Sequence, residues 1–211
     1  MDTTDAADLI AEIHEDRAEN EQAERFRNRA ALLIALLAAI LAIGGLGGGN
    51  ATDDMIDANI RASDTWAFFQ AKNIRQTQFE LAADEIETFL ADPGLAADAR
   101  SRLTARLADY RATIARYEDE ADAEAPADPL RGEGKRQLRA RAQSFEAARE
   151  RASEQDGNFD MAEVLLQLAL VLGSVAILAV NRPILILSAV LGAGGALLTA
   201  NGFLLLAPLP F

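Results

Sequence analysis

The segment that decides the fold is residues 30–48, AALLIALLAAILAIGGLGG, which contains no charged side chain. Two further apolar segments follow later, residues 164–180 (VLLQLALVLGSVAILAV) and residues 184–207 (ILILSAVLGAGGALLTANGFLLLA). A helix needs about 20 residues to cross the roughly 30 Å hydrocarbon core of a bilayer, so each segment is long enough. The alternative, three buried helices of a soluble protein, requires more covering surface than 211 residues supply. We therefore expect transmembrane helices at 30–49, 161–180 and 184–207.

The residues before the first apolar segment do not resemble a signal peptide. A signal peptide has a short basic start and a small-residue cleavage site, whereas residues 1–29 are long and mostly acidic. We interpret residues 30–49 as a retained anchor. We expect residues 1–29 to form an acidic, amphipathic helix or tail, with Leu9, Ile10 and Ile13 on one side.

Composition narrows the class of protein. The chain is 50% hydrophobic and only 6% aromatic, which favours an all-α fold rich in Ala and Leu over a β-sandwich. Its net charge of −13 argues against a nucleic-acid partner. With no Cys and a single His, disulfides, thiol chemistry and Cys or His metal sites are disfavoured. His14, among acidic neighbours, is interpreted as part of a solvated helix face.

The basic residues beside the apolar segments predict an orientation. Arg25, Arg27 and Arg29 precede the first segment, and Arg182 lies in the short link between the second and third. Because Lys and Arg are enriched in cytoplasmic loops, both places should be cytoplasmic. Residues 50–160 and the C-terminus would then be periplasmic, in a multi-pass protein of the bacterial inner membrane.

Residues 50–160 are expected to form an extramembrane helical domain. A helix should begin near Thr52 or Asp53, after the flexible Gly44–Gly49 cluster, and end before the turn Asp92-Pro93-Gly94. A second should run from about Leu95 into the acidic run 118–124, followed by a linker. A third should span about 135–155 and end at Gly157-Asn158, with Asp160 and Glu163 capping the next helix.

Heptad spacing predicts how these helices pack, as an antiparallel coiled-coil hairpin or bundle. Steps of four and three occur in the second helix, at Leu103, Leu107, Tyr110, Ile114, Tyr117 and Ala121. Seven-residue repeats occur at Ile60, Ala67, Ile74 and Leu81 in the first helix, and at Leu138, Phe145 and Ala152 in the third. The seams are rich in Ala and therefore narrow, which suggests additional stabilisation by self-association or by other membrane proteins.

Small residues four apart inside the apolar segments suggest close helix contacts in lipid. They are Gly44 with Gly48, Gly45 with Gly49, Ala169 with Gly173, and the run Ser188, Gly192, Ala196 and Ala200. These contacts could join chains or lie within one chain, and the spacing leaves both open.

A polar patch lies in the stretch WAFFQAKNIRQ at residues 66–76, which holds the only Trp and one of only two Lys residues. We predict that the patch sets the register of the helical domain or of an oligomer interface. Its members are Trp66, Phe69, Gln70, Lys72, Asn73 and Gln76. The alternative is that it contacts a ligand or ion in a passage.

The same stretch resembles the DUF4337 family of uncharacterised bacterial membrane proteins. The likeness rests on the pattern W-x-x-[YF]-Q-A-K-x-x-[KR]-Q, which is matched by Trp66, Phe69, Gln70, Ala71, Lys72, Arg75 and Gln76. One early apolar segment, a helical middle and two closing segments support it. Phe69 stands where the family often has Tyr, so a hydroxyl is missing here. The resemblance implies fold and location but no activity.

No catalytic, cofactor or metal motif is recognisable in the sequence. The apolar segments also lack an internal carboxylate or Lys, which disfavours an ion-coupled carrier. We therefore expect a non-enzymatic integral membrane protein without a cofactor, either a homo-oligomeric scaffold or an accessory subunit of a larger inner-membrane complex. Its expected partners are membrane lipid, further copies of itself and other membrane proteins. The alternative is a passive channel or transport accessory in which the 66–76 helix lines a polar passage.

Overall fold

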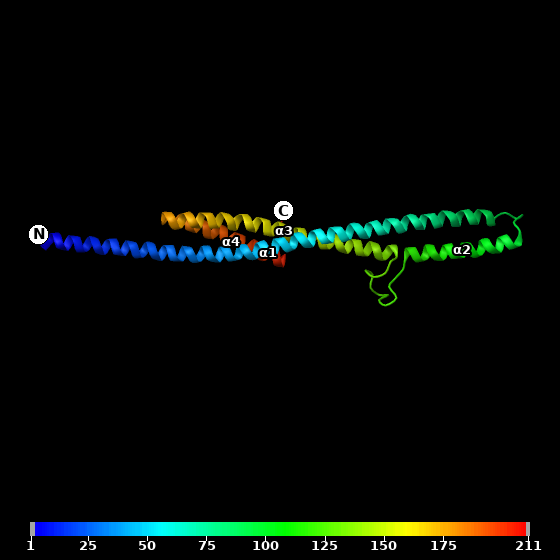
Figure 1. Cartoon of the computed structure of the whole chain (residues 1–211), viewed down its shortest axis with the longest axis horizontal. Helices are drawn as coiled ribbons and strands as arrows, with labels where there is room; N and C mark the ends of the chain where they lie inside the picture. Colours follow the sequence, from blue (N-terminus) through cyan, green and yellow to red (C-terminus); the bar gives the residue numbers. More distant parts are fainter. Residues whose placement is uncertain (1–2, 210–211) are drawn as a thin grey trace. The chain divides into compact units, whose positions relative to one another are not determined.

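The fold is all-α, as the composition predicts. A computed structural model describes residues 3–209, with side chains given for His14, Arg17 and residues 20–209. The helices are α1 (Thr3–Leu90), α2 (Ala97–Glu118), α3 (Lys135–Ala179) and α4 (Arg182–Leu204) (Figure 1). Within residues 3–209 there is no strand, and an isolated antiparallel bridge joins Ala121 to Gly132. The amphipathic side predicted for Leu9, Ile10 and Ile13 lies outside the described side chains, and His14 is exposed.

The chain divides into two compact units, which we describe separately. The apolar unit comprises residues 1–53 and 152–211, and the hairpin unit comprises residues 54–151. Both α1 and α3 contribute to each unit, whereas α2 belongs to the hairpin unit and α4 to the apolar unit.

In the apolar unit, the parts of α1, α3 and α4 are long and apolar enough to cross a membrane. Many of the buried residues are small and many large apolar side chains face outward, although Leu37 and Leu166 are buried. Ala30, Ala169, Ala176 and Ser188 are fully buried, while Leu32, Leu178 and Leu197 are more than 70% exposed. A soluble protein buries its large apolar side chains, so this inverted arrangement is typical of helices packed in lipid.

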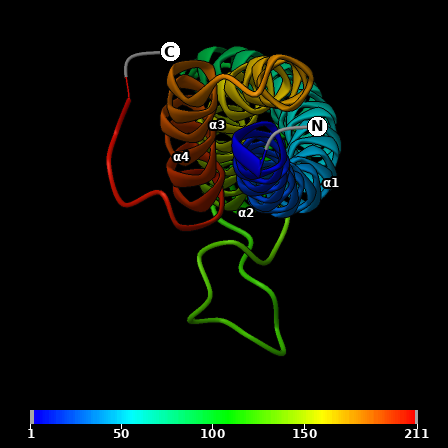
Figure 2. The same ribbon diagram turned by 90° about the vertical axis from the view of Figure 1, so that its left-hand side faces the viewer.

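The three helices of the apolar unit lie side by side (Figure 1 and Figure 2), and glycines allow them to approach closely. A Cβ atom added at Gly192 of α4 would lie 2.5 Å from Leu37 of α1. One added at Gly173 of α3 would lie 2.9 Å from Ile34 of α1. A methyl group at either position would force the Leu37 or Ile34 side chain to move, so glycine permits this close approach.

Several of the predicted small-residue positions are therefore used within one chain. Gly44 and Gly48 face Thr199 and Phe159, whereas Gly45 and Gly49 meet nothing within 4 Å of an added Cβ. In α4, Ser188 and Gly192 are buried, but Ala196 is half-buried and Ala200 exposed.

Two predicted helix boundaries are wrong. The Gly44–Gly49 cluster does not interrupt α1, which begins long before Thr52. Likewise α3 continues through Gly157-Asn158 to Ala179, so Asp160 and Glu163 cap no helix there. In α1 packing outweighs the weak helix propensity of glycine, because Phe159 of α3 fits against Gly47 and Gly48.

The link between α3 and α4 is as short as the sequence predicts. Val180 takes a left-handed conformation with φ of 48°, and the Asn181 side chain accepts a hydrogen bond from the Ile184 amide at 3.3 Å. This is an N-cap with Pro183 in the first turn of α4. The helix ends at Leu204, slightly before the predicted end at 207, because Leu205 is also left-handed, with φ of 47°.

In the hairpin unit, α2 and the start of α3 pack one after the other along α1. The Leu107 side chain of α2 is buried against Ala83 and Ile86 of α1, and Leu103, Tyr110 and Ile114 pack around them. Between α1 and α3, Trp66 Nε1 of α1 donates to Glu146 Oε1 of α3 at 2.8 Å. The segment 119–134 connects α2 to α3 and projects away from the helices (Figure 1).

The seams predicted for α2 and α3 are confirmed over most of their length. Leu107, Leu138 and Ala152 are buried, and the other predicted positions within α2, together with Phe145, are half-buried. Ala121, however, lies beyond the end of α2 at Glu118.

The seam predicted for α1 is wrong. Ile60, Ile74 and Leu81 are 54%, 60% and 65% exposed, and Ala67 is exposed as well. The inward positions instead follow steps of four and three on the opposite face of the helix. They are Ala58, Ala62, Thr65, Phe69, Lys72, Gln76, Phe79, Ala83, Ile86 and Leu90.

Candidate functional site

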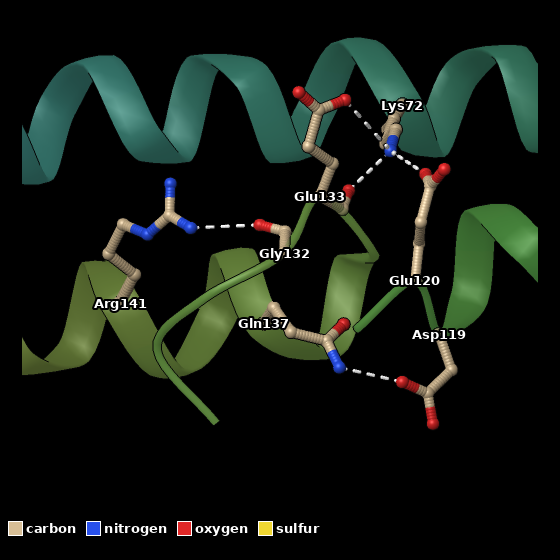
Figure 3. Close-up of polar contacts among 7 residues, drawn as sticks. All are labelled: Lys72, Asp119, Glu120, Gly132, Glu133, Gln137 and Arg141. Carbon is tan, nitrogen blue, oxygen red and sulfur yellow. Dashed lines mark hydrogen bonds and ion pairs between the residues drawn. The ribbon is translucent and has the colours of Figure 1, made fainter. Parts of the chain in front are cut away.

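The most strongly polar place inside the hairpin unit surrounds Lys72, which occupies an inward heptad position of α1. Its side chain is only 7% exposed. Lys72 Nζ donates to Glu120 Oε2 at 3.0 Å and to the carbonyl oxygen of Glu133, and the Glu133 carboxylate lies 3.9 Å away (Figure 3). Glu120 follows the end of α2 and Glu133 precedes α3, so one ammonium group connects both helix ends to α1. We call this arrangement the lysine joint.

Aromatic rings complete the surroundings of the ammonium group. Lys72 Nζ lies 5.4 Å from the ring centroid of Tyr117 and 5.7 Å from that of Phe68. Such distances allow cation–π attraction. Phe79 makes edge contacts with the Tyr110 and Tyr117 rings at 5.2 and 6.0 Å. The cation is therefore held between carboxylate and carbonyl oxygens and ring faces.

The second lysine of the chain lies beside the first. Lys135 Nζ, in the first turn of α3, contacts Glu118 Oε2 at 3.1 Å and Asn73 Oδ1 at 3.0 Å. Gln76 Nε2 donates to Glu118 Oε2 at 3.3 Å and to Glu80 Oε1 at 3.2 Å. The last residue of α2 is thus tied both to α1 and to α3.

The segment 119–134 is closed at its base by the backbone. The Glu133 and Gly134 amides donate to the Glu120 carbonyl at 2.9 and 3.3 Å. Gly132 has φ of 104°, and a Cβ there would lie 2.2 Å from the same carbonyl, so only glycine fits. Arg141 fastens this side of the segment by donating to the Gly132 carbonyl at 2.8 Å (Figure 3).

Two side-chain amide groups beside the lysine joint, those of Gln76 and Gln137, are incompletely paired. Gln137 Nε2 donates to Asp119 Oδ1 at 2.6 Å. The Oε1 atoms of Gln76 and Gln137 are buried without a hydrogen-bond partner among the described residues. A buried acceptor that stays unpaired costs about 1–3 kcal/mol.

The predicted patch at 66–76 contributes unequally to this site. Lys72 and Gln76 are buried, Trp66 and Phe69 half-buried, and Gln70 and Asn73 exposed. Trp66 and Phe69 pack edge to face at 5.4 Å, and Arg139 lies 5.4 Å above the Phe69 ring. Five of the six residues contact other parts of the hairpin unit, and no described polar contact involves Gln70.

The partners of the patch lie far away in sequence and were not predicted. A signal for them exists, because both lysines of the chain lie here and the acidic run 118–124 lies close to one of them in sequence. The residues concerned are Glu118, Asp119, Glu120, Glu133, Lys135, Gln137 and Arg141.

The charged groups around Lys72 can hold α1, the end of α2 and the start of α3 together by electrostatic attraction. The Lys72 ammonium is occupied by two oxygen acceptors, and the nearby carboxylates are paired with Lys or Arg. Among the residues whose side chains are described, no group of three or more His, Asp or Glu residues is arranged to hold a metal ion.

Acid should weaken one contact beside the lysine joint, that of Glu118 with Lys135. The pKa of the Glu118 carboxyl is held below its ordinary value of 4.5, mainly by the hydrogen bond from Lys135, while partial burial acts in the opposite direction. A carboxyl with a lowered folded-state pKa contributes stability that is complete above the unfolded pKa and is lost as pH falls through the folded pKa.

We therefore expect stability to fall as pH drops below about 4.5, and to fall less steeply in Glu118→Gln. Thermal unfolding of the purified protein in neutral detergent between pH 6 and pH 3 measures this difference. Glu85→Gln, an exposed carboxylate on α1, is the control. Equal pH dependence in Glu118→Gln and the unchanged protein would contradict the expectation.

These features define the class of the protein. It is all-α, with three helices long and apolar enough to cross a membrane and a helical hairpin that contains the lysine joint. The chain belongs to the DUF4337 family: the family model, described as a domain of unknown function, matches residues 26–205. Neither a curated protein nor a solved structure matches the chain. The matched range covers most of the chain and includes the lysine joint.

Proposed function

We propose that this chain is a non-enzymatic, multi-pass protein of the bacterial inner membrane whose hairpin unit associates with a second copy to form a scaffold. The observation that carries the proposal is the apolar stripe on the outer face of α1. We define the α1 stripe as Ile56, Ile60, Ile74 and Leu81, each at least 50% exposed. Three of these residues lie on a seven-residue repeat, which is the spacing used in helix–helix seams.

Membrane anchoring favours a second copy as the partner. Two copies inserted in the same orientation present their stripes side by side and parallel, at a high local concentration. Matching seven-residue repeats then remain in register along both helices. A different membrane protein with a similar stripe is the second possible partner, in which case the chain is an accessory subunit.

The distribution of arginines supports the proposed orientation. Arg25, Arg29 and Arg182 line one hollow at one end of the apolar unit. The positive-inside rule then favours a cytoplasmic location for this end. The hairpin unit and the C-terminus would lie in the periplasm.

Cysteine cross-linking tests self-association, because the chain has no native Cys. Oxidation of membranes containing Ile74→Cys should give a disulfide-linked dimer. Arg75→Cys is the matched control, since adjacent helical residues point about 100° apart. We expect at least several-fold less dimer from the control. Equal cross-linking at both positions would indicate random collision and contradict a specific stripe.

A second measurement separates the possible partners. Light scattering of the detergent-purified protein should show an oligomer, and Ile60→Asp with Ile74→Asp should shift it to monomer. These side chains are exposed, so the fold of each chain should survive. A monomer that co-purifies with another membrane protein would support the accessory subunit instead. A monomer alone would overturn the scaffold proposal.

The channel alternative is less well supported by the contacts. Asn73 and Gln76, which in the channel alternative would line a passage, bond to Lys135 and Glu118 within the hairpin unit. Flux through liposomes that is abolished by Gln70→Leu would restore this alternative.

A further inference from the structure

A hollow in the apolar unit carries charges and apolar surface of the kind that binds a lipid headgroup. It has a volume of roughly 460 Å³ and is formed by α1 and the start of α4. Its polar lining is Arg25, Arg29, Arg182 and Gln22, and its apolar lining is Phe26, Leu185 and Ile186. We propose that this arginine hollow binds the phosphate of an anionic membrane phospholipid.

The arginines come together from distant parts of the sequence. Arg25 and Arg29 are one turn apart on α1, and Arg182 is the first residue of α4. A guanidinium group offers up to five donors in a planar arrangement that suits two oxygens of one phosphate. Three such groups around one hollow therefore favour an anionic ligand with several acceptor oxygens.

These arginines have few competing partners. Arg25 Nη2 contacts Glu21 Oε2 at 2.9 Å, but both side chains are more than 60% exposed, so the pair contributes little and is easily exchanged. Among the residues whose side chains are described, Arg29 and Arg182 have no ionic partner within 4.0 Å. The positive charge is thus available to a ligand.

The position along the helices favours a lipid over a soluble anion. Arg29 immediately precedes the charge-free segment that starts at Ala30, and Arg182 lies two residues before the apolar run at Ile184. The hollow therefore lies at the level where a spanning helix meets the headgroups. Phe26, Leu185 and Ile186 offer apolar contacts beside the phosphate position, where the first carbons of an acyl chain would lie.

Native mass spectrometry of the delipidated full-length protein in neutral detergent tests the proposal. The probes are phosphatidylglycerol, which is anionic, and phosphatidylcholine, which carries the same phosphate with no net charge. We expect phosphatidylglycerol to bind more tightly, and Arg29→Gln with Arg182→Gln to weaken it about tenfold or more.

Arg27→Gln is the matched control, because Arg27 lies on the same stretch of α1 but does not line the hollow. It should leave phosphatidylglycerol binding within about twofold. A loss as large as that of the double variant would show attraction by general surface charge and overturn a defined site. Arg29→Lys with Arg182→Lys keeps the charge and should give intermediate binding, because an ammonium lacks the planar pair of donors.

Inorganic phosphate distinguishes the two sources of the ligand. If millimolar phosphate displaces the lipid and binds equally well alone, the hollow is a soluble-anion site and the lipid proposal is wrong. The inference rests on the membrane insertion proposed above, which carbonate extraction tests separately. Release of the protein from membranes by carbonate would contradict the proposed function. If the protein stays in the membrane but binds both lipids equally well, only the lipid-site inference is contradicted.

Discussion

Replacement of Lys72 by Met is expected to lower the free energy of unfolding of the hairpin unit by about 2–4 kcal/mol. Met keeps the length and apolar stem of Lys but removes the ammonium group. The Glu133 carbonyl and the Glu120 carboxylate then lose their shared donor. Removal of one partner from a buried ion pair costs about 3–5 kcal/mol. Glu120 is 35% exposed and can be rehydrated in part, which places the expected cost lower.

The same replacement should open the base of the 119–134 segment. The Glu133 and Gly134 amides are bonded to the Glu120 carbonyl, next to the side chain that Lys72 holds. Hydrogen–deuterium exchange of these two amides should therefore accelerate by at least about tenfold, while the Leu107 region of α2 keeps its protection. Denaturant unfolding of the detergent-solubilised protein measures the loss of stability.

Arg75→Met is the control for loss of a positive charge on the same helix. Arg75 is exposed and lies three residues from Lys72, and its removal should change stability by less than about 0.5 kcal/mol. If Lys72→Met leaves both stability and exchange unchanged, the ammonium group does not connect the two helix ends.

The lysine joint also explains why the α1 seam was assigned to the wrong face. Ile60, Ile74 and Leu81 are large and apolar, so their repeat indicates a core in a soluble helix. The inward face instead includes Lys72 and Gln76, which a hydrophobicity pattern rejects. These polar residues are tolerated there because partners from the 118–135 region reach them. Such long-range pairing cannot be read from the spacing within α1.

Helix continuity was hard to predict for a related reason. Glycines at 44–49 and at 157 are typical of helix ends when only local propensity is considered. In the apolar unit Gly44, Gly47 and Gly48 are contact positions inside a continuous helix, and a local pattern cannot distinguish the two uses. By contrast, the ends of α2 and the start of α3 are predicted closely from sequence, because Pro93, Gly94, Gly132 and Gly134 lie in the connections between helices, where local turn chemistry decides.

Two adjacent glycines of α4, Gly194 and Gly195, should differ in how well they tolerate a larger side chain. A Cβ at Gly195 would lie 2.6 Å from Leu166 Cγ and 3.1 Å from the Ala162 carbonyl oxygen of α3. Leu166 is fully buried, and the carbonyl belongs to a helix backbone, so neither can move aside. At Gly194 an added Cβ would meet only Leu165 Cδ1, at an ordinary 3.5 Å.

Gly195→Leu should therefore force α4 away from α3 and destabilise the apolar unit by about 3 kcal/mol, at the upper end of the usual cost of overpacking. Gly194→Leu should change stability by less than about 1 kcal/mol, because its side chain enters ordinary contact and Leu is the better helix former. Unfolding of both variants in a series of mixed micelles with increasing SDS measures the difference. Similar stability of the two variants would mean that α3 and α4 do not pack through Gly195, since a general intolerance of large residues in α4 would affect both positions alike.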